Sequence, residues 1–200
     1  ACAPYRRLHL CHHNLETIKN TTSTSTDTLL AEVCYAAKEE GDLIKTHYTP
    51  YQQKYVNPDS QLCTVLARSF ADIGDIVRGR DLFLGHEQRK KHLEKRLEQM
   101  FQNIKKDTPE LKNLKPEQIR EYWWTANRDE VWKAITCNDD NKLASASYFR
   151  QTCGGDENTA TEAKNKCRCE KKRGTSGDVN IVPTYFDYVP QYLRWFEEWA

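Results

Sequence analysis

The most regular pattern of apolar and polar positions runs from Leu62 to Phe83 and predicts a helix. Its apolar residues recur at steps of three and four, the spacing of one helical face: Leu62, Leu66, Phe70, Ile73 and Val77. Because Cys63 and Val65 widen that face, we expect the helix to be buried among others. Gly74 and Gly79 each cost about 1 kcal/mol of helix propensity relative to alanine. Their presence indicates close packing against another backbone, or a break near Gly79.

The same periodicity predicts four further helices. Asp27 begins one that extends to about Glu40, with Gly41 as its stop, and Pro50 and Pro58 limit helix length in the next segment. Residues 86–106 form an amphipathic helix whose inward positions are Leu93, Leu97, Met100, Phe101 and Ile104. Another helix begins at Pro116, ends at Cys137 and is lined by Ile119, Trp123, Ala126, Trp132 and Ile135. The last contains Tyr192, Leu193, Phe196 and Trp199.

Consecutive tryptophans stand in the middle of the helix that begins at Pro116. Only one of two neighbouring helix residues can face the core squarely. We assign core packing to Trp123 and leave Trp124 open between secondary packing and an exposed contact.

These elements predict a mostly α fold, a disulfide-braced helical bundle with long irregular loops. We expect an irregular N-terminal piece over 1–26, a helical core over 27–137, a variable cysteine-containing loop over 138–183 and the start of a C-terminal helix over 184–200. The loop offers few apolar residues, so cross-links rather than a core of its own would hold it.

Composition excludes several classes of protein. The net charge is +1, from 30 basic and 29 acidic residues, so no global field points to a nucleic-acid partner. No apolar run reaches the roughly 18 residues of a transmembrane helix, and no signal peptide opens the chain. Because the sequence lacks an initiator methionine and stops within an apolar helical pattern, we expect a piece of a longer protein.

Cysteine usage indicates an oxidising compartment. The chain has eight cysteines and no CxxC pair, which favours disulfides over metal sites. Eight thiols allow 105 pairings, and the sequence leaves the choice open. The structural disulfide candidates are Cys2, Cys11, Cys34, Cys63, Cys137, Cys153, Cys167 and Cys169.

No catalytic, cofactor or metal site emerges from the motifs. The stretch 74–81 lacks the Lys and Ser/Thr that a phosphate-binding loop requires. The cluster at 9–13 has histidines beside Cys11, but no second ligand pair at zinc-site spacing. Glu94 and Glu98 are separated by one helical turn, a spacing typical of a solvated face. We therefore expect a protein that is not an enzyme and carries no cofactor.

Two basic patches are candidates for binding. The first comprises Arg89, Lys90, Lys91, Lys95 and Arg96; the second comprises Lys164, Lys166, Arg168, Lys171, Lys172 and Arg173. Clustered cations suit a sulfated polysaccharide. The competing interpretation is a pair of solvated faces, because glutamates such as Glu87 and Glu170 dilute the charge.

Four longer motifs resemble a known family. They are CAPYRRLHLC at 2–11, LARSFADIGDIVRGRDLF at 66–83, YWWTANRDEVWKAITC at 122–137 and TYFDYVPQYLRWFEEWA at 184–200. Together they are similar to the Duffy-binding-like domain, alpha class, of the malaria parasite's erythrocyte membrane protein 1 family. The resemblance spans essentially the whole chain and implies an incomplete copy of a mostly helical adhesion domain.

The resemblance also implies a setting and partners. It places the domain on the extracellular face of the infected red-cell membrane, in a variant antigen whose single membrane anchor lies outside this chain. The implied partner is a host cell-surface receptor protein or a sulfated glycan like heparan sulfate, with rosetting and cytoadherence as the outcome. The motifs transfer no contact residues, so the candidates come from the basic patches: Arg89, Lys90, Lys91, Lys95, Lys171, Lys172 and Arg173. The alternative is a structural and antigenic spacer, with binding carried by neighbouring domains.

Overall fold

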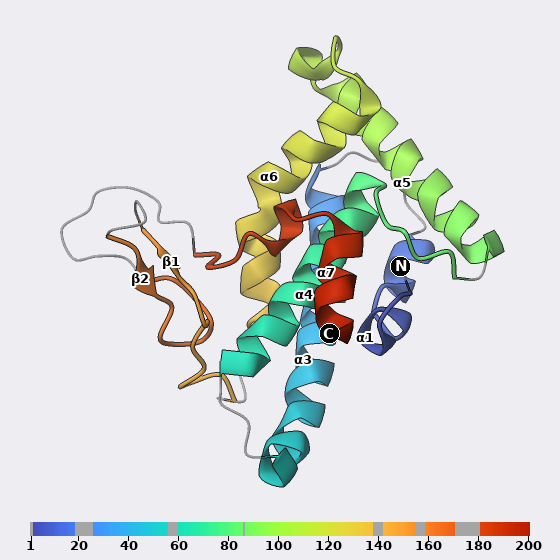
Figure 1. The fold of residues 1–200 in the computed structure, drawn as a ribbon. Helices are drawn as coiled ribbons and strands as arrows, with labels where there is room; N and C mark the ends of the chain where they lie inside the picture. The colour runs from blue at the N-terminus through green and yellow to red at the C-terminus, as the bar shows by residue number, and fades with distance from the viewer. Residues whose placement is uncertain are drawn as a thin grey trace.

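A computed structural model describes residues 2–18, 26–55, 60–85, 87–137, 142–154, 159–170 and 181–200, and this part of the chain is mostly helical (Figure 1). The α-helices are α1 (Tyr5–Leu8), α2 (His13–Glu16), α3 (Thr26–Tyr55), α4 (Ser60–Arg78), α5 (Glu87–Asp107), α6 (Pro116–Ile135) and α7 (Gln191–Trp199). Two 3₁₀ helices, η1 (Pro109–Leu111) and η2 (Phe186–Tyr188), and a hairpin of β1 (Gln151–Cys153) and β2 (Thr161–Glu162) complete the described elements. None of the described helices is both long and apolar enough to span a bilayer.

Helix α4 lies at the centre of the fold, in contact with α3, α6, η2 and α7. The apolar residues predicted for it are buried except Val65, which is half-buried, and the prediction that this helix lies among others is confirmed. The helix ends at Gly79, whose φ of 72° suits a glycine. The amide of Arg80 donates to the carbonyl of Asp75 at 2.8 Å and closes the last turn. The predicted break near Gly79 is therefore confirmed.

Two glycines let α3, α4 and α6 pack closely. A Cβ atom on Gly74 would lie 2.7 Å from a ring carbon of Trp124, so α4 meets α6 through a glycine and a buried indole. A Cβ atom on Gly41 would collide with the carbonyl oxygen of Ile135. The prediction that Gly41 stops its helix is wrong: α3 continues to Tyr55, and Gly41 is the point where α6 approaches. Pro50 also lies within α3 and does not limit it as expected.

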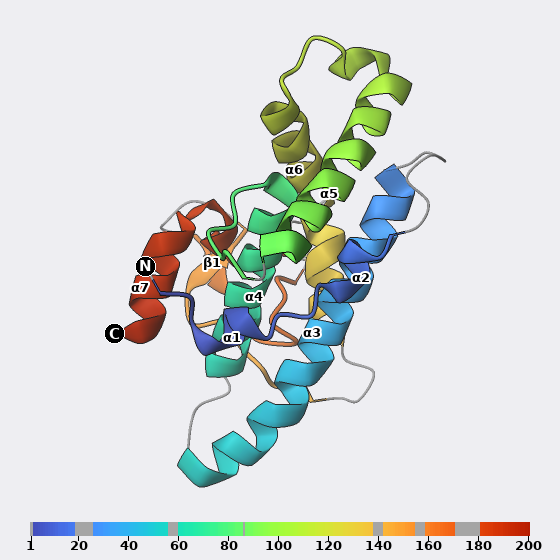
Figure 2. The same cartoon turned by 90° about the vertical axis from the view of Figure 1, so that its right-hand side faces the viewer.

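Helices α5 and α6 are joined through η1 and together project from the body (Figures 1 and 2). All five inward positions predicted for α5 are buried. In α6, Trp123 and Trp124 are both buried, so the open assignment of Trp124 is settled as packing. Ala126 is exposed, contrary to the prediction that it lines the core, because α6 turns this position away from α3 and α4.

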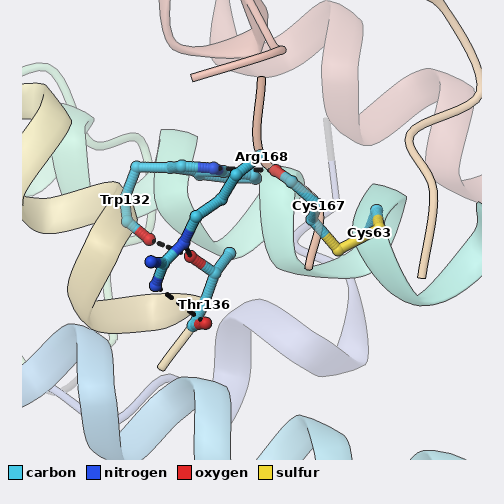
Figure 3. Close-up of a disulfide and its surroundings, with 5 residues drawn as sticks. All are labelled: Cys63, Trp132, Thr136, Cys167 and Arg168. Atoms are coloured by element: carbon cyan, nitrogen blue, oxygen red, sulfur yellow. Dashed lines mark hydrogen bonds between the residues drawn. A yellow bond between two sulfur atoms is a disulfide. The ribbon is translucent and has the colours of Figure 1, made fainter. Parts of the chain in front are cut away.

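One disulfide fastens the segment after α6 to the bundle, and a second lies within that segment. Cys63 of α4 pairs with Cys167, and Cys153 pairs with Cys169. Figure 3 shows the first bridge beside Trp132, whose indole Nε1 donates to the carbonyl of Cys167 at 3.0 Å. This segment also adds Leu143, Tyr148 and Ala163 to the core, more than its composition predicts. The other four candidates, Cys2, Cys11, Cys34 and Cys137, are free thiols in this structure.

Helix α7 buries two polar residues and leaves most of its large apolar side chains exposed. Gln191, Arg194 and Trp195 are buried, whereas four large apolar side chains of the helix are exposed: Tyr192, Leu193, Phe196 and Trp199. The helix end lies beside the N-terminal segment in both views, where the Trp199 indole donates to the carbonyl of Cys2 at 3.0 Å.

Candidate functional site

The first basic patch lies on α5. Arg89, Lys91 and Lys95 are exposed on this helix. Lys91 pairs with Glu87 at 2.5 Å, one turn away, and both side chains are largely in solvent. Among the described residues, neither Arg89 nor Lys95 has a recorded ion-pair partner. We call the set of Arg89, Lys91 and Lys95 the α5 basic surface.

Lys90 has a different role from its neighbours. Its ammonium group donates to the carbonyl oxygens of Asp81 at 3.0 Å and Phe83 at 2.7 Å. The side chain is thus committed to holding the loop that follows α4. Arg96, also in the first patch, donates to the carbonyl of Ile18. Lys90 and Arg96 therefore support the fold and leave the α5 basic surface to the other three.

The second basic patch is only partly described. Lys171, Lys172 and Arg173 lie outside the described residues. Lys164 and Lys166 are exposed, but Arg168 is committed to the C-terminus of α6. Its guanidinium donates to the carbonyls of Lys133 at 2.8 Å and Thr136 at 3.0 Å (Figure 3 shows the contacts with Thr136). Cations are favoured there because the carbonyls at a helix C-terminus carry partial negative charge.

A buried ionic network joins α1, α4 and α7. Asp72 of α4 accepts from Arg6 and from Arg194 of α7, at 2.7 Å in each case. Asp75, one turn later, accepts from Arg194 at 2.6 Å and from Arg78 at 3.0 Å. Buried charges are tolerated when they are paired and hydrogen-bonded, as these are.

A second buried pair links α6 to η2. Arg128 contacts the carboxylate of Asp187 with two nitrogens, at 2.9 and 2.8 Å. The indole of Trp124 donates to the same carboxylate at 2.9 Å. Both donors to Asp187 lie on α6, so this carboxylate holds the segment before α7 against that helix.

The two α4 carboxyl groups have pKa values shifted in opposite directions. Burial acts to raise the pKa of Asp72, but the guanidiniums of Arg6 and Arg194 outweigh it and the pKa is lowered. Burial also raises the pKa of Asp75, and here its arginine partners do not fully offset the cost. The negative charge of Asp72 adds to that rise.

The thiol and histidine cluster near the N-terminus lacks the chemistry of a nucleophile. Burial, together with the charge of Glu40, raises the pKa of Cys11 to about 11, so the thiol stays protonated at neutral pH. Burial likewise lowers the pKa of His12, whose Nδ1 lies 2.8 Å from the carbonyl of Leu10. In the described part of the chain, no group of three His, Cys, Asp or Glu side chains could hold a metal ion.

The residues that sequence reasoning missed are the buried ions. Asp72 and Asp75 are buried because η2 and α7 also pack against α4. A buried carboxylate needs a partner, and arginines of the first and last motifs, Arg6 and Arg194, were available. That signal was present, but which arginine meets which aspartate depends on the packing of three distant elements.

Comparisons with known proteins agree on one family. A model of the Duffy binding domain matches residues 1–194. The NTS-DBL1(alpha-1) domain of Plasmodium falciparum membrane protein 1 (PfEMP1) from the varO strain is 41% identical, with a TM-score of 0.77 over 100% of this chain and 43% of that chain. A DBLb domain of PfEMP1 bound to human ICAM-1 is 28% identical, with a TM-score of 0.64 over 97% of this chain and 38% of that chain.

A more distant structure shares the fold. The P. falciparum erythrocyte binding antigen 140 is 23% identical, with a TM-score of 0.60 over 98% of this chain and 24% of that chain. No curated protein sequence matches. The chain spans less than half the length of each of these three structures. The helical, disulfide-braced bundle and a family model that matches nearly every residue lead to the same assignment: the chain belongs to the Duffy binding domain family, whose members are adhesion domains rather than enzymes.

Proposed function

We propose that this chain is part of an adhesion domain displayed on the outer face of an infected red cell, in a variant antigen anchored by a membrane span outside this chain. Its partners are host-cell sulfated glycans or receptor proteins. The observation that carries the glycan part is the α5 basic surface, where Arg89, Lys91 and Lys95 are exposed on one helix. This surface would meet red-cell glycans in rosetting.

The spacing of the α5 basic surface suits a sulfated chain. Lys91 and Lys95 are one helical turn apart, which places their Cβ atoms about 6 Å from one another. Both side chains are exposed, and the ion pair of Lys91 with Glu87 lies largely in solvent, so the ammonium groups can meet sulfates at little desolvation cost. Such binding is electrostatic and weakens as salt rises, since the Debye length is about 8 Å at physiological ionic strength.

A receptor protein is the other proposed partner class. The DBLb domain that shares this fold is described as bound to human ICAM-1, a host protein. That likeness supports host receptor proteins as a class of partner for this chain. The identity of the receptor does not follow from it, because the two chains are only 28% identical.

Heparin chromatography of the 200-residue chain tests the glycan assignment. We expect Lys95→Glu to elute at lower salt than the native chain. Lys112→Glu is the matched control, because Lys112 is an exposed lysine after η1 and the change in charge is the same. Equal loss of retention in both variants would show that net charge drives retention, and would overturn the role of the α5 basic surface.

The alternative function is a structural and antigenic spacer, and one observation favours it. Lys90, Arg96 and Arg168, three of the patch cations, bind carbonyl groups of their own chain rather than facing a ligand. Deletion of this domain from its parent protein separates the two proposals. Reduced red-cell binding supports adhesion, whereas unchanged binding, together with no heparin retention of the chain itself, supports the spacer.

A further inference from the structure

A cavity lies between α5 and α6, where the end of α4 meets both helices. Its volume is about 370 Å³, within the range of about 300–1,000 Å³ that is typical of ligand sites. The apolar part of its lining includes Phe101 of α5 and Ile119 of α6, and the end of α4 contributes Arg78 and Gly79. We call this cavity the α5–α6 pocket.

The two helices that form the pocket are tied to one another. Arg120 of α6 pairs with Glu94 of α5 at 2.8 Å. A Cβ atom on Gly79 would collide with the guanidinium of Arg120, so the glycine that ends α4 leaves room for this ion pair. Lys105 of α5 donates to the carbonyl of Leu114 at 2.8 Å and ties the end of α5 to the segment before α6. A ligand would therefore meet a preformed site, and binding would not have to order the helices.

The two arginines that line the pocket are already matched by carboxylates. Arg120 has Glu94 as its partner. Arg78 pairs with Asp75 at 3.0 Å and with Glu121 at 3.3 Å, and neither of these carboxylates lines the pocket. Neither arginine therefore adds an unmatched positive charge to the site.

Two carboxylates of the pocket lack such a partner. Glu98 of α5 and Glu117 of α6 line it from the two helices, and both are exposed. Within the described residues neither has a recorded ion pair, and Glu98 accepts only a long hydrogen bond, at 3.4 Å, from the amide of Gln102. Lys105 is the remaining cation of the lining, so two carboxylates stand against one ammonium group that already binds a carbonyl. The pocket thus combines an apolar surface with one negative charge in excess.

We propose that the α5–α6 pocket binds an arginine side chain presented by a partner protein. The aliphatic part of that side chain packs on Phe101 and Ile119, and the guanidinium donates to Glu98 and Glu117. Arginine suits two separate carboxylates better than lysine does, because its planar guanidinium carries five donors whereas an ammonium group is a point charge. Arginine is also one of the residues that most often anchor protein interfaces. This contact is separate from the α5 basic surface and does not depend on glycan binding.

Three capped amino acids test the chemistry of the ligand. Acetyl-arginine-amide, acetyl-citrulline-amide and acetyl-lysine-amide are titrated into the ¹⁵N-labelled 200-residue chain at low ionic strength. Citrulline is the matched control, because it has the shape of arginine and a neutral urea in place of the guanidinium. We expect the arginine probe to bind at least about tenfold more tightly than the citrulline probe and about threefold more tightly than the lysine probe. Its amide shifts should centre on Phe101, Gln102 and Ile119.

Two results of these titrations would overturn the proposal. Equal affinity for the arginine and citrulline probes would show that the carboxylates do not select a cation. Shifts centred outside the α5–α6 pocket would place the binding elsewhere on the chain. Equal affinity for the arginine and lysine probes would reject recognition of the guanidinium.

Variants then test the two carboxylates. Glu98→Gln and Glu117→Gln should each weaken the arginine probe by at least about threefold, since each removes a charged acceptor. Glu110→Gln is the matched control, because Glu110 is an exposed carboxylate on η1 that does not line the pocket. Equal losses in all three variants would show general electrostatic attraction and reject the site. A dimer in sedimentation that Glu98→Gln disrupts would assign the pocket to a second copy of the chain and reject a separate partner protein.

Discussion

At the scale of single residues, glycine determines how closely the central helices approach. Gly74 leaves room for the six-membered ring of Trp124, a fully buried side chain whose indole nitrogen donates to Asp187. Alanine at this position should raise helix propensity by about 1 kcal/mol, yet it forces a Cβ atom against an indole that cannot move freely. We expect Gly74→Ala to lower the free energy of unfolding by about 1–3 kcal/mol, measured by urea denaturation.

A double-variant cycle identifies the cause of that loss. In a Trp124→Phe background the ring atoms nearest Gly74 are absent, so Gly74→Ala should cost less there than in the native chain. Equal costs in the two backgrounds would show that the indole contact is not the reason.

At the scale of elements, α4 presents two carboxyl groups with opposed pH behaviour. The pKa of Asp72 is lowered in the folded chain, so its ion pairs stabilise the fold at every pH above the ordinary pKa of about 3.9. This stability is lost as the pH falls through the lower pKa of the folded state. The raised pKa of Asp75 has the opposite effect on stability. As the pH falls, the folded chain binds this proton before the unfolded chain does, and that binding stabilises the fold.

Urea denaturation at several pH values tests these two effects on stability. The pH should run from about 2 to 6, because the ordinary pKa of an aspartate is about 3.9. Asp72→Asn should make the acid loss of stability shallower than in the native chain, and Asp75→Asn should make it steeper. Identical pH slopes for the native chain and both variants would contradict the two assigned shifts.

On α7, two neighbouring aromatic side chains differ sharply in burial. Trp195 is 1% exposed, whereas its neighbour Phe196 is 74% exposed. We expect Trp195→Ala to cost about 3–5 kcal/mol of unfolding free energy. Phe196→Ala should change it by less than about 0.5 kcal/mol, because that side chain lies on the surface. Comparable losses in the two variants, measured by thermal or urea denaturation, would mean that the Phe196 face is covered in solution.

The elements differ in how well their sequence predicts them, for physical reasons. Helix α5 has a charged face and an apolar face, so periodicity alone identifies Leu93 and Leu97 as buried. The sequence does not identify the role of Gly41, because a helix-stopping glycine and a close-packing glycine look alike in sequence. Only the backbone of α6, at Ile135, distinguishes the two.

The candidate site shows the same limit. Exposure of Arg89 and Lys95 follows from the pattern of α5, and the structure places both in solvent. Lys90 could not be separated from them, because its partners are the backbone carbonyls of Asp81 and Phe83. Backbone carbonyls are the same at every position, so the sequence does not predict which lysine binds them.

At the scale of the whole molecule, the disulfides close loops of different size. Cys63 and Cys167 are separated by 104 residues, and Cys153 and Cys169 by 16. On the chain-entropy account, a bridge over about 100 residues contributes about 4.7 kcal/mol and one over about 15 residues about 3. We expect the Cys63→Ala, Cys167→Ala double variant to lose more stability in urea denaturation than the Cys153→Ala, Cys169→Ala variant.

The reverse order would show that local packing of the hairpin, rather than loop closure, decides what each bridge contributes. The Cys153–Cys169 variant is the informative control, because it removes a bridge from the same segment without releasing that segment from α4.

The contact between the two ends of the described chain has a mechanical consequence. Trp199 binds the carbonyl of Cys2, and Arg6 binds Glu198 at 2.9 Å and Asp72 at 2.7 Å. A pull applied between Cys2 and Trp199 acts on these contacts in series, beginning with the outermost. The N-terminal segment would peel away from α7 one contact at a time under low load. Tension would reach the helical core and its Cys63–Cys167 bridge only after those polar contacts had parted.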